Sequence, residues 1–427
     1  MDAVQVVPIG HTKKSSHSKG LIASIILMIL LLSLRDIGGF AVNKYLFLVI
    51  TAVTVLALPI DKVMCFIAFV MPLYIGLPGN YMTMIFLARF LLDYRKLRFK
   101  GTTFMFCVFA GSYALIQSFI TNHTDISELM FFPGMILVMF MFSIDVKIDK
   151  SKLILSYAMG VAALGLIMLI HTLKFCDLGE LLTSTNRLGS ILQAQKTGML
   201  INIDPNYYGL FCIALISLGV KNLNDNSGKS ADKKSKTLMI LLMGICVIIG
   251  LIGLSRAFVL VMIAWLLLYL LSVKNMRAFL VSAIAFIIAL MLVINFIPDV
   301  WKAINDRFSD STMATGNGRT ELIVKFHEAW SAKFSTMLFG VGIFDCNVHC
   351  MPLQVLYGGG LVFGILFVLY TITLLKTKNS NRSSSVLQKY LPLTVSLAMS
   401  CSVPALVLIN IMYPVILTGL WMNQGEQ

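Results

Sequence analysis

The sequence predicts an all-α, polytopic helical integral membrane protein, and three observations support this fold class. Of its 427 residues, 58% are hydrophobic and only 13% are charged, whereas a soluble domain carries about 25% charged residues. Apolar runs long enough to cross a bilayer recur along the whole chain. These runs do not alternate with a period of two, as the strands of a membrane barrel would. We therefore expect one membrane domain over residues 1–427, with about 12–14 transmembrane helices.

The predicted spans follow one another at short intervals, with ends uncertain by several residues. The last apolar run, 391–420, contains Pro404 and Pro414. At 1.5 Å per residue it is too long for one span and short for two, so it forms either one helix with a re-entrant piece or two short helices. The other predicted spans are 20–34, 45–60, 63–77, 82–92, 102–120, 126–144, 153–175, 206–220, 237–254, 257–273, 278–296 and 353–375.

The basic residues predict the orientation of the chain. The net charge is +14, and when the N-terminus is placed in the cytoplasm, most Lys and Arg residues fall in short cytoplasmic segments. This distribution follows the positive-inside rule, so the net positive charge indicates how the chain is oriented in the membrane. We therefore expect no nucleic-acid partner. No small-residue cleavage site follows the first apolar run, which we expect to be a retained helix.

With this orientation, two long loops face away from the cytoplasm, at residues 176–204 and 297–352. Two large loops on one face suggest binding or chemistry there. The second loop contains helical spacing of apolar residues near 320–334, which predicts a helix lying on the surface. The chain shows no pair of interrupted helices in two similar halves, the pattern expected of many transporters.

Arg256 is the only charge among the 37 residues from 237 to 273. One helix of that length would far exceed the thickness of a bilayer, so the run must fold back at its only polar break, Ser255-Arg256. Arg256 would then lie at a tight turn near the membrane surface. It is either an interfacial anchor that snorkels or part of an anion site at a helix start.

The second loop supplies two further candidate residues. Arg319 follows Asn317-Gly318 and lies near the positive end of the predicted surface helix. The loop continues through Gly340 and Gly342, which permit a tight turn, to His349 at the membrane boundary. A histidine there serves either as an acid or base near neutral pH or only as a local hydrogen-bonding group.

The first loop contains Arg187 and ends at Asp204-Pro205. We favour Asp204 as the cap of the next helix over a catalytic role, because Asp at N-cap and Pro at N1 form a typical helix start. Cys346 and Cys350 could pair in an oxidising compartment, although small buried cysteines are common in apolar runs. The sequence contains no metal-binding or nucleotide-binding motif, so we expect no cofactor.

Four features in this order resemble the O-antigen polymerase (Wzy type) and O-antigen ligase superfamily of bacterial envelopes. They are two enlarged outer loops between apolar runs, DPNYYG opening a span, LSRAF at a helical hairpin, and GR…W…GVG…H leading into LQVLYGGG. The resemblance covers residues 187–370 best. Polymerases of this family show an Arg-x10-Gly pattern in both loops, which Arg187 with Gly198 and Arg307 with Gly318 match. Ala257 replaces the family's small glycine after the hairpin arginine.

The resemblance implies a glycosyltransferase in the bacterial inner membrane that polymerises oligosaccharide repeat units into O-antigen or capsule. The donor would be a glycan on undecaprenyl diphosphate, and the acceptor a second lipid-linked unit. Arg256 and Arg319 would bind the diphosphate, His349 would orient or deprotonate the acceptor hydroxyl, and Arg187, Arg307 and Asp204 would contact substrate. The reaction would need no metal, and a chain-length regulator is a possible partner alongside membrane lipid.

Three alternatives to a polymerase stay open. An O-antigen ligase uses the same donor but transfers the glycan to a sugar of the lipid A core. A lipid-linked oligosaccharide flippase also has 12–14 helices, but it would place its arginines in a central cavity between two similar halves. A structural or receptor-like membrane protein is the remaining possibility.

Overall fold

The computed structural model describes most of the chain in helical segments. The described residues are 11–120, 126–181, 188–189, 200–225, 233–272, 318–375, 386–404, 406 and 408–423, with single positions between 280 and 306. Within them the only extended pairing is one isolated bridge between Leu97 and Ile144. Five helices are long and apolar enough to cross a membrane, and shorter apolar helices accompany them. The all-α fold class is therefore confirmed for the described part, and its composition fits a multi-pass membrane protein.

Most helices begin and end within five residues of the predicted spans, but the first begins nine residues earlier and the span predicted at 126–144 is divided at Met130. The span predicted at 278–296 lies almost entirely outside the described residues. In chain order the structure contains α1 (His11–Asp36), α2 (Lys44–Ala57), α3 (Ile60–Leu73), η1 (Tyr74–Gly76), α4 (Gly79–Leu92), η2 (Tyr94–Lys96), α5 (Gly101–Ile120), α6 (Ile126–Leu129), α7 (Phe131–Ser143), α8 (Lys150–Thr172), α9 (Leu178–Leu181), α11 (Pro205–Asp225), α12 (Lys233–Ile252), α13 (Arg256–Ser272), α16 (Arg319–Ser331), α17 (Phe334–Phe339), α18 (Met351–Leu353), η5 (Gln354–Gly358), α19 (Gly359–Leu375), α20 (Val386–Ser400) and α21 (Ile409–Asn423).

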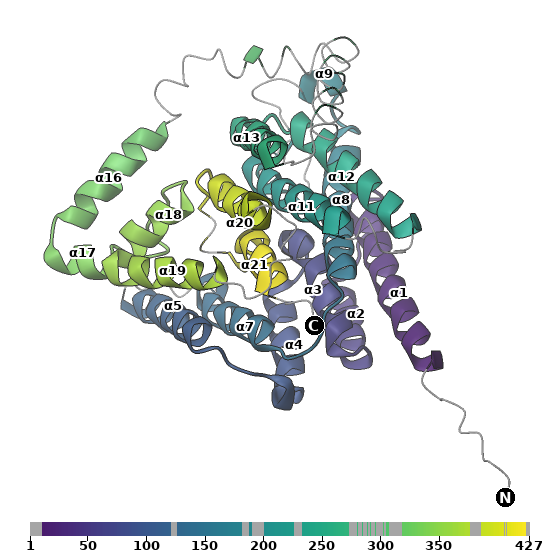
Figure 1. The fold of residues 1–427 in the computed structure, drawn as a ribbon, viewed down its shortest axis with the longest axis horizontal. Helices are drawn as coiled ribbons and strands as arrows, with labels where there is room; N and C mark the ends of the chain where they lie inside the picture. The colour runs from purple at the N-terminus through teal and green to yellow at the C-terminus, as the bar shows by residue number, and fades with distance from the viewer. Residues whose placement is uncertain are drawn as a thin grey trace, which may run out of the picture.

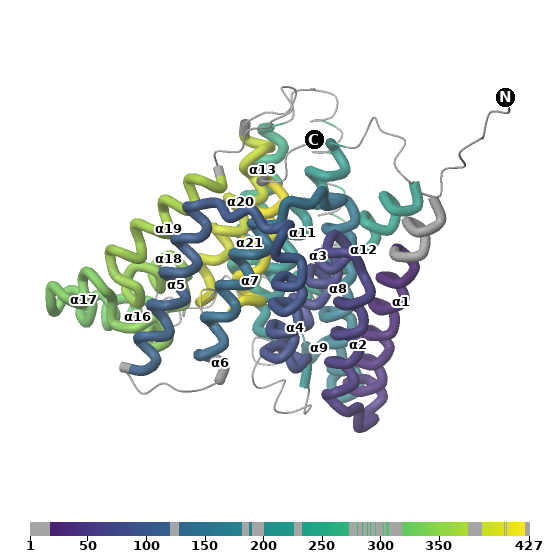
Figure 2. Tube along the Cα trace, turned by 90° about the horizontal axis from the view of Figure 1, so that it is seen from below, coloured from purple at the N-terminus to yellow at the C-terminus, as the bar shows by residue number. Residues whose placement is uncertain are grey.

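Helices α3, α11 and α21 form the centre of the bundle, as Figures 1 and 2 show. Nearly every residue of α3 is buried, which is the pattern of a helix surrounded by others. It packs most closely against α8, where Gly160 lies against the main chain of Phe69; a Cβ at Gly160 would be 2.2 Å from the Phe69 carbonyl oxygen. The close approach of these two helices therefore requires glycine at this position.

One group of contacts joins the ends of helices at what we call the basic face. Arg98 pairs with Asp145 at 2.8 Å, Ser151 donates to Asn222, and the Lys150 ammonium lies 4.7 Å from the centre of the Trp421 ring. All these residues lie in segments that the sequence places on the cytoplasmic side, or at the adjoining helix ends. The contacts follow the predicted alternation of spans, for which the positive-inside rule predicts that this face is cytoplasmic.

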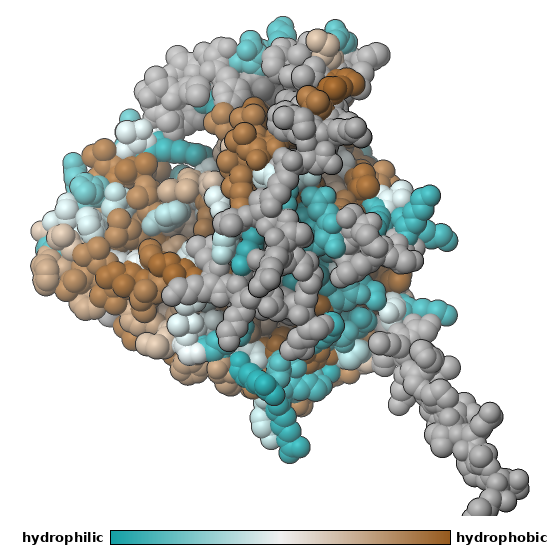
Figure 3. All heavy atoms as spheres, viewed as in Figure 1, coloured by the Kyte–Doolittle hydropathy of each residue, from teal (hydrophilic) through white to brown (hydrophobic). Residues whose placement is uncertain are grey.

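The opposite end of the bundle, which we call the site face, carries the turns around residues 36–37, 171–174, 204–206, 253–256 and 340–354. Here Gln117 near the end of α5 accepts a hydrogen bond from the Ile343 N–H at 2.8 Å. The α16–α17 arm extends away from the bundle on this part of the molecule (Figure 1). Its tip is apolar in Figure 3, with Phe334 74% exposed and Phe339 52% exposed.

The fold-back predicted at Ser255-Arg256 is confirmed. Helix α12 ends at Ile252 and α13 begins at Arg256. Leu254 takes a left-handed conformation, with φ of +50°, which reverses the chain in three residues. Phe258, in the first turn of α13, is fully buried against Gly209 of α11 and Gly250 of α12.

The surface helix predicted at 320–334 is shorter than expected. Helix α16 ends at Ser331, and α17 begins at Phe334 after Lys333 adopts an extended conformation. The Thr336 hydroxyl donates to the Trp330 carbonyl at 2.8 Å, which satisfies a carbonyl group at the end of α16 and stops the helix. Phe326 is buried, whereas Phe334, which the sequence placed in the same helix, begins α17 and is exposed.

The segment Gly340–Gly342 and the segment Tyr357–Gly360 contact each other through main-chain atoms beneath the arm. Gly340 and Gly342 both have positive φ, at +79° and +122°, so the predicted tight turn is confirmed. The N–H groups of Val341 and Gly342 donate to the carbonyls of Tyr357 and Gly358, and a Cβ at Gly340 would lie 2.1 Å from the Gly358 oxygen. The turn is thus docked on η5, a π-helical turn at the start of the α19 span.

The apolar run 391–420 forms two short helices, which decides between the two predicted possibilities. Helices α20 and α21 each have 15 residues and are separated by a turn after Ser400. The amide oxygen of Gln354 accepts from the Leu406 N–H in that turn, at 3.3 Å. Trp421 near the end of α21 lies at the basic face beside Lys150, so this pair of helices returns to the face from which it enters.

Candidate functional site

Asp204 caps α11 on the site face. Its Oδ1 accepts a hydrogen bond from the Asn206 N–H at 2.8 Å, and its carbonyl accepts from the Tyr208 N–H at 3.0 Å. This is the N-cap arrangement that the Asp-Pro pair predicts, with Pro205 at the first helical position. The capping interpretation of Asp204 is therefore confirmed. Because only Oδ1 forms the cap, the Asp204 carboxylate can also interact with charged neighbours.

The start of α11 is joined directly to the α12–α13 turn. The Ser255 hydroxyl donates to Asn206 Oδ1 at 2.7 Å and accepts from the Phe258 N–H at 3.2 Å. Ser255 is therefore both the buried N-cap of α13 and the link between two helix starts. Arg256 follows it as the first residue of α13 and is half-buried. Arg256 is thus the first residue of a helix N-terminus, where main-chain N–H groups favour an anion.

Arg319 is the first residue of α16, after Gly318 with φ of +77°. The predicted position of this arginine at a positive helix end is confirmed. Helix α16 packs on the rest of the loop through a small apolar cluster of Phe326, Cys346, Val348 and Tyr357. This cluster packs the α16–α17 arm against η5. It thereby holds Arg319 near His349, at the end of the same loop.

His349 lies half-buried between charges of opposite sign. Burial lowers the pKa of His349 below its ordinary value of 6.5, the positive charge of Arg319 lowers it further, and the Asp204 carboxylate partly opposes both effects. Loss of water disfavours the charged imidazolium, and a nearby cation does the same. His349 is therefore neutral near pH 7, which is the form that can accept a proton.

The structure brings together most of the residues that the sequence predicted as a site. Asp204 and Arg319 both act on the pKa of His349, and the start of α13 that carries Arg256 is joined to the start of α11 by the contact of Ser255 with Asn206. Arg187 and Arg307 lie outside the described residues. Three stretches that are distant in sequence therefore converge on one part of the site face.

Sequence reasoning missed one residue whose contacts organise this region. Gln354 is 1% exposed and joins the Ile343 carbonyl to the Leu406 N–H, with both distances 3.3 Å. A lone amide at the start of an apolar span was the available signal, because a buried polar group needs partners. Cys346 and Cys350 are both free thiols, and Cys346 lies in the cluster under α16. The disulfide that the sequence left open between these two residues is therefore not formed, and the preferred interpretation as small apolar cysteines fits the structure.

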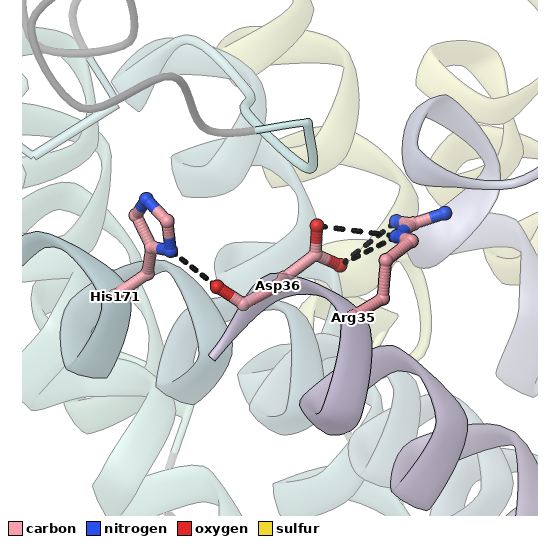
Figure 4. Close-up of polar contacts among 3 residues, drawn as sticks. All are labelled: Arg35, Asp36 and His171. Atoms are coloured by element: carbon pink, nitrogen blue, oxygen red, sulfur yellow. Dashed lines mark hydrogen bonds and ion pairs between the residues drawn. The ribbon is translucent and has the colours of Figure 1, made fainter. Parts of the chain in front are cut away.

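A second polar cluster on the site face is a helix connection and no part of this site (Figure 4). Asp36 forms an ion pair with Arg35 at 2.8 Å, and its carbonyl contacts the His171 Nδ1 at the end of α8. The Lys174 ammonium donates to the neighbouring Ile37 carbonyl. These contacts join the ends of α1 and α8, which lie across the bundle from α16 in Figure 1.

No group of three or more His, Cys, Asp or Glu side chains in the described part of the chain is arranged to hold a metal ion. Comparison of the chain with protein-family models, with curated proteins and with solved structures gave no match. The site must therefore be interpreted from its own chemistry. It offers two arginines at helix starts and a neutral histidine beside a carboxylate, on one face of a bundle of apolar helices.

Proposed function

We propose that this protein polymerises oligosaccharide repeat units carried on undecaprenyl diphosphate, at the outer face of a bacterial inner membrane. In this proposal the chain has about 12–14 transmembrane helices, a cytoplasmic N-terminus and two outer loops at 176–204 and 297–352. The reaction is a glycosyl transfer to a second lipid-linked unit. The product is O-antigen or capsular polysaccharide.

One observation carries the proposal: three sequence features that resemble the polymerase and ligase superfamily lie together. These are the DPNYYG start of α11, the SRAF start of α13, and the segment from Arg319 to His349. The arrangement supplies cations and a proton acceptor at one membrane boundary. A reaction outside the cytoplasm has no ATP, so it needs a donor that is already activated, and a sugar diphosphate is such a donor.

Each side chain has a specific role in the proposed reaction. The acceptor hydroxyl attacks the anomeric carbon of the donor, the bond from that carbon to the diphosphate oxygen breaks, and undecaprenyl diphosphate leaves. His349 takes the hydroxyl proton, because its imidazole is neutral. Arg256 and Arg319 stabilise the charge that develops on the leaving diphosphate, as preorganised donors do in other transfer reactions. The step requires no metal ion.

The test is complementation of a strain that lacks the gene. We expect Arg256→Ala and Arg319→Ala to reduce polymer formation by about 10²–10³-fold at normal protein levels, because each removes a contact that strengthens in the transition state. His349→Ala should reduce it by about 10²–10⁴-fold. Lys325→Ala is the matched control, because Lys325 is an exposed cation on the same helix as Arg319.

The surface polysaccharide pattern of the deletion strain separates the candidate functions. Single repeat units on the lipid A core support the polymerase. Long chains that accumulate on undecaprenyl diphosphate beside bare core identify a ligase, for which the same arginines would bind the donor. Retention of lipid-linked units inside the cell identifies a flippase and overturns the mechanism, as does long-chain polysaccharide from the two arginine variants.

A further inference from the structure

The α16–α17 arm ends in an uncharged tip whose aromatic rings point away from the protein. From Phe334 to Phe344 the sequence contains no charged residue. Phe334 is 74% exposed and Phe339 is 52% exposed, and both belong to α17. The proposed reaction uses neither ring, and exposed phenylalanines at the end of an arm indicate a surface that another phase or molecule covers.

Hydrogen bonds fix the side of α17 that points outward. The Trp330 indole N–H donates to the Met337 carbonyl at 3.2 Å, and the Thr336 hydroxyl donates to the Trp330 carbonyl at 2.8 Å. These bonds hold one side of α17 against the end of α16. With about 3.6 residues per turn, the opposite arc of the helix carries Phe334, Ser335, Leu338 and Phe339. Only one of these four residues, a serine, is polar.

The tip continues an exposed apolar stripe on the span α19. The stripe consists of Leu361, Ile365, Val368, Leu369 and Ile372, which are 36–59% exposed. Their spacing places them on one side of a helix, and this helix is long and apolar enough to cross a membrane. Gly360, directly before the stripe, lies so close to α17 that a Cβ there would be 2.3 Å from the Leu338 carbonyl oxygen. Lipid that covers the stripe therefore borders α17 as well.

The arm lies at the side of the bundle. Figures 1 and 2 both place α17 at the edge of the molecule opposite α1. In Figure 2, where α1 and α2 run up and down, α17 lies at the left edge and not at the top or bottom. A segment that extends sideways from membrane spans meets lipid, whereas a segment that continued along their axes would enter water.

The residues that border the tip are those typical of a membrane boundary. The Trp330 ring lies 5.7 Å from the Tyr357 ring between centroids, and Trp and Tyr are enriched where a membrane meets water. Lys333, directly before Phe334, is exposed. A lysine at this position can place its stem in apolar surroundings and its ammonium among phosphate groups.

We propose that the tip of the arm, residues 333–339, is inserted into the lipid leaflet at the site face, between the headgroups and the acyl chains. The two phenyl rings contact acyl chains, and the Lys333 ammonium contacts headgroup phosphates. The tip thereby anchors α16, and with it Arg319, at the membrane surface. The inference does not rest on the proposed glycosyl transfer, because it requires only that α19 spans a membrane.

Spin labelling measures the depth of the tip. The full chain, with its native cysteines replaced by serine, is placed in vesicles of phosphatidylethanolamine and phosphatidylglycerol, and Phe334→Cys or Phe339→Cys carries a nitroxide. Power saturation compares collisions with oxygen, which concentrates in lipid, and with a nickel chelate, which stays in water. We expect the ratio of oxygen to nickel collisions to be several-fold higher at both positions than at an aqueous site, as for a depth of about 5–10 Å.

Two other positions calibrate this ratio. Glu328→Cys on α16 provides the aqueous value, because its side chain is exposed on the same arm. Leu369→Cys in the stripe of α19 provides the value for a span that faces lipid. A ratio at the tip equal to that of Glu328→Cys would overturn the proposal, because the tip would then lie in water. Protection from both reagents would also overturn it, because a protein surface would then cover the rings.

Photocrosslinking tests the same contact in a chain that keeps its cysteines. Phe334 is replaced by p-benzoylphenylalanine, whose benzophenone inserts into a neighbouring C–H bond on irradiation. We expect the mass of the intact protein to increase by that of one phospholipid, and we expect no such adduct with the same substitution at Glu328. A crosslink from position 334 to a second copy of the chain, or to another protein, in place of the lipid adduct contradicts the proposal.

Discussion

Asp204 combines two roles in one carboxylate. One oxygen caps α11 through the Asn206 N–H, and the charge raises the pKa of His349 against the effects of burial and Arg319. The two roles require different chemistry. A cap needs only an accepting oxygen, whereas the effect on His349 needs a negative charge.

We expect Asp204→Asn to separate these roles. Asparagine caps a helix as well as aspartate does, so stability should change little, while the pKa of His349 should fall further because only the lowering effects remain. Asp204→Ala should also lose the cap, at a cost of about 0.5–2 kcal/mol. Unfolding in detergent measures the first effect, and the pH dependence of His349 modification by diethyl pyrocarbonate measures the second. Equal stability of the Asn and Ala variants would contradict the capping role.

His349 predicts the pH dependence of the proposed transfer. The imidazole must be neutral to accept a proton, and its pKa lies below 6.5. Activity should therefore be constant near pH 7–8 and fall only as the pH drops through that lowered pKa, when His349 takes up a proton. Initial rates with purified protein from pH 5 to 8 measure this limb. An activity loss centred above pH 7 would assign the proton transfer to another group.

At the scale of elements, the α12–α13 hairpin depends on a slot for one aromatic ring. Phe258 fills the space left by two glycines, and a Cβ at Gly250 would lie 2.8 Å from its ring. Gly244 lies in the same helix and meets no atom within 4 Å. The two glycines of α12 thus differ in packing and in little else.

This pair gives a matched test of the packing. We expect Gly250→Ala to lower stability by about 1–3 kcal/mol, because it overfills a close-packed contact. Gly244→Ala should be neutral or stabilising by up to about 1 kcal/mol, since alanine favours a helix. Thermal unfolding of the two variants in detergent measures the difference. Similar stability of both variants would show that Phe258 does not occupy this slot.

The helices were predictable because their signals are local. The length of the apolar run around Arg256 and the polar break within it placed the hairpin within a residue or two. The end of α16 was not predictable, because a hydroxyl of the following helix, from Thr336, stops it. Likewise, the two helices after Val386 could not be told from one helix with a re-entrant piece, since the turn between them is bonded by Gln354, which lies in another segment of the chain.

At the scale of the whole molecule, contacts divide the chain into two faces. Ion pairs and hydrogen bonds at the basic face join segments that the sequence assigned to one side, and the candidate site lies at the other. The convergence of the site was only partly predictable. Each motif was visible in the sequence, but its contact with the others, such as that of Ser255 with Asn206, depends on how the helices pack.

Cysteine labelling tests the sidedness directly. In a chain without other cysteines, we expect Glu328→Cys on α16 to react with a membrane-impermeant maleimide in cells with a permeable outer membrane. Lys96→Cys at the basic face should react only after lysis. Both side chains are exposed, so access depends on the membrane alone. The reverse pattern would place the N-terminus outside, and labelling of both in intact cells would show that these two segments share one side.

The seam between Gly340-Val341-Gly342 and Tyr357–Gly360 is made by main-chain atoms. Its geometry is therefore nearly independent of the side chains that surround it, provided that the glycines stay. Evolution could replace most of the arm and most of the span while keeping the arm docked. Proteins with the same architecture would then share a sparse spacing of glycines with little overall identity, and that spacing is the feature by which to search for relatives.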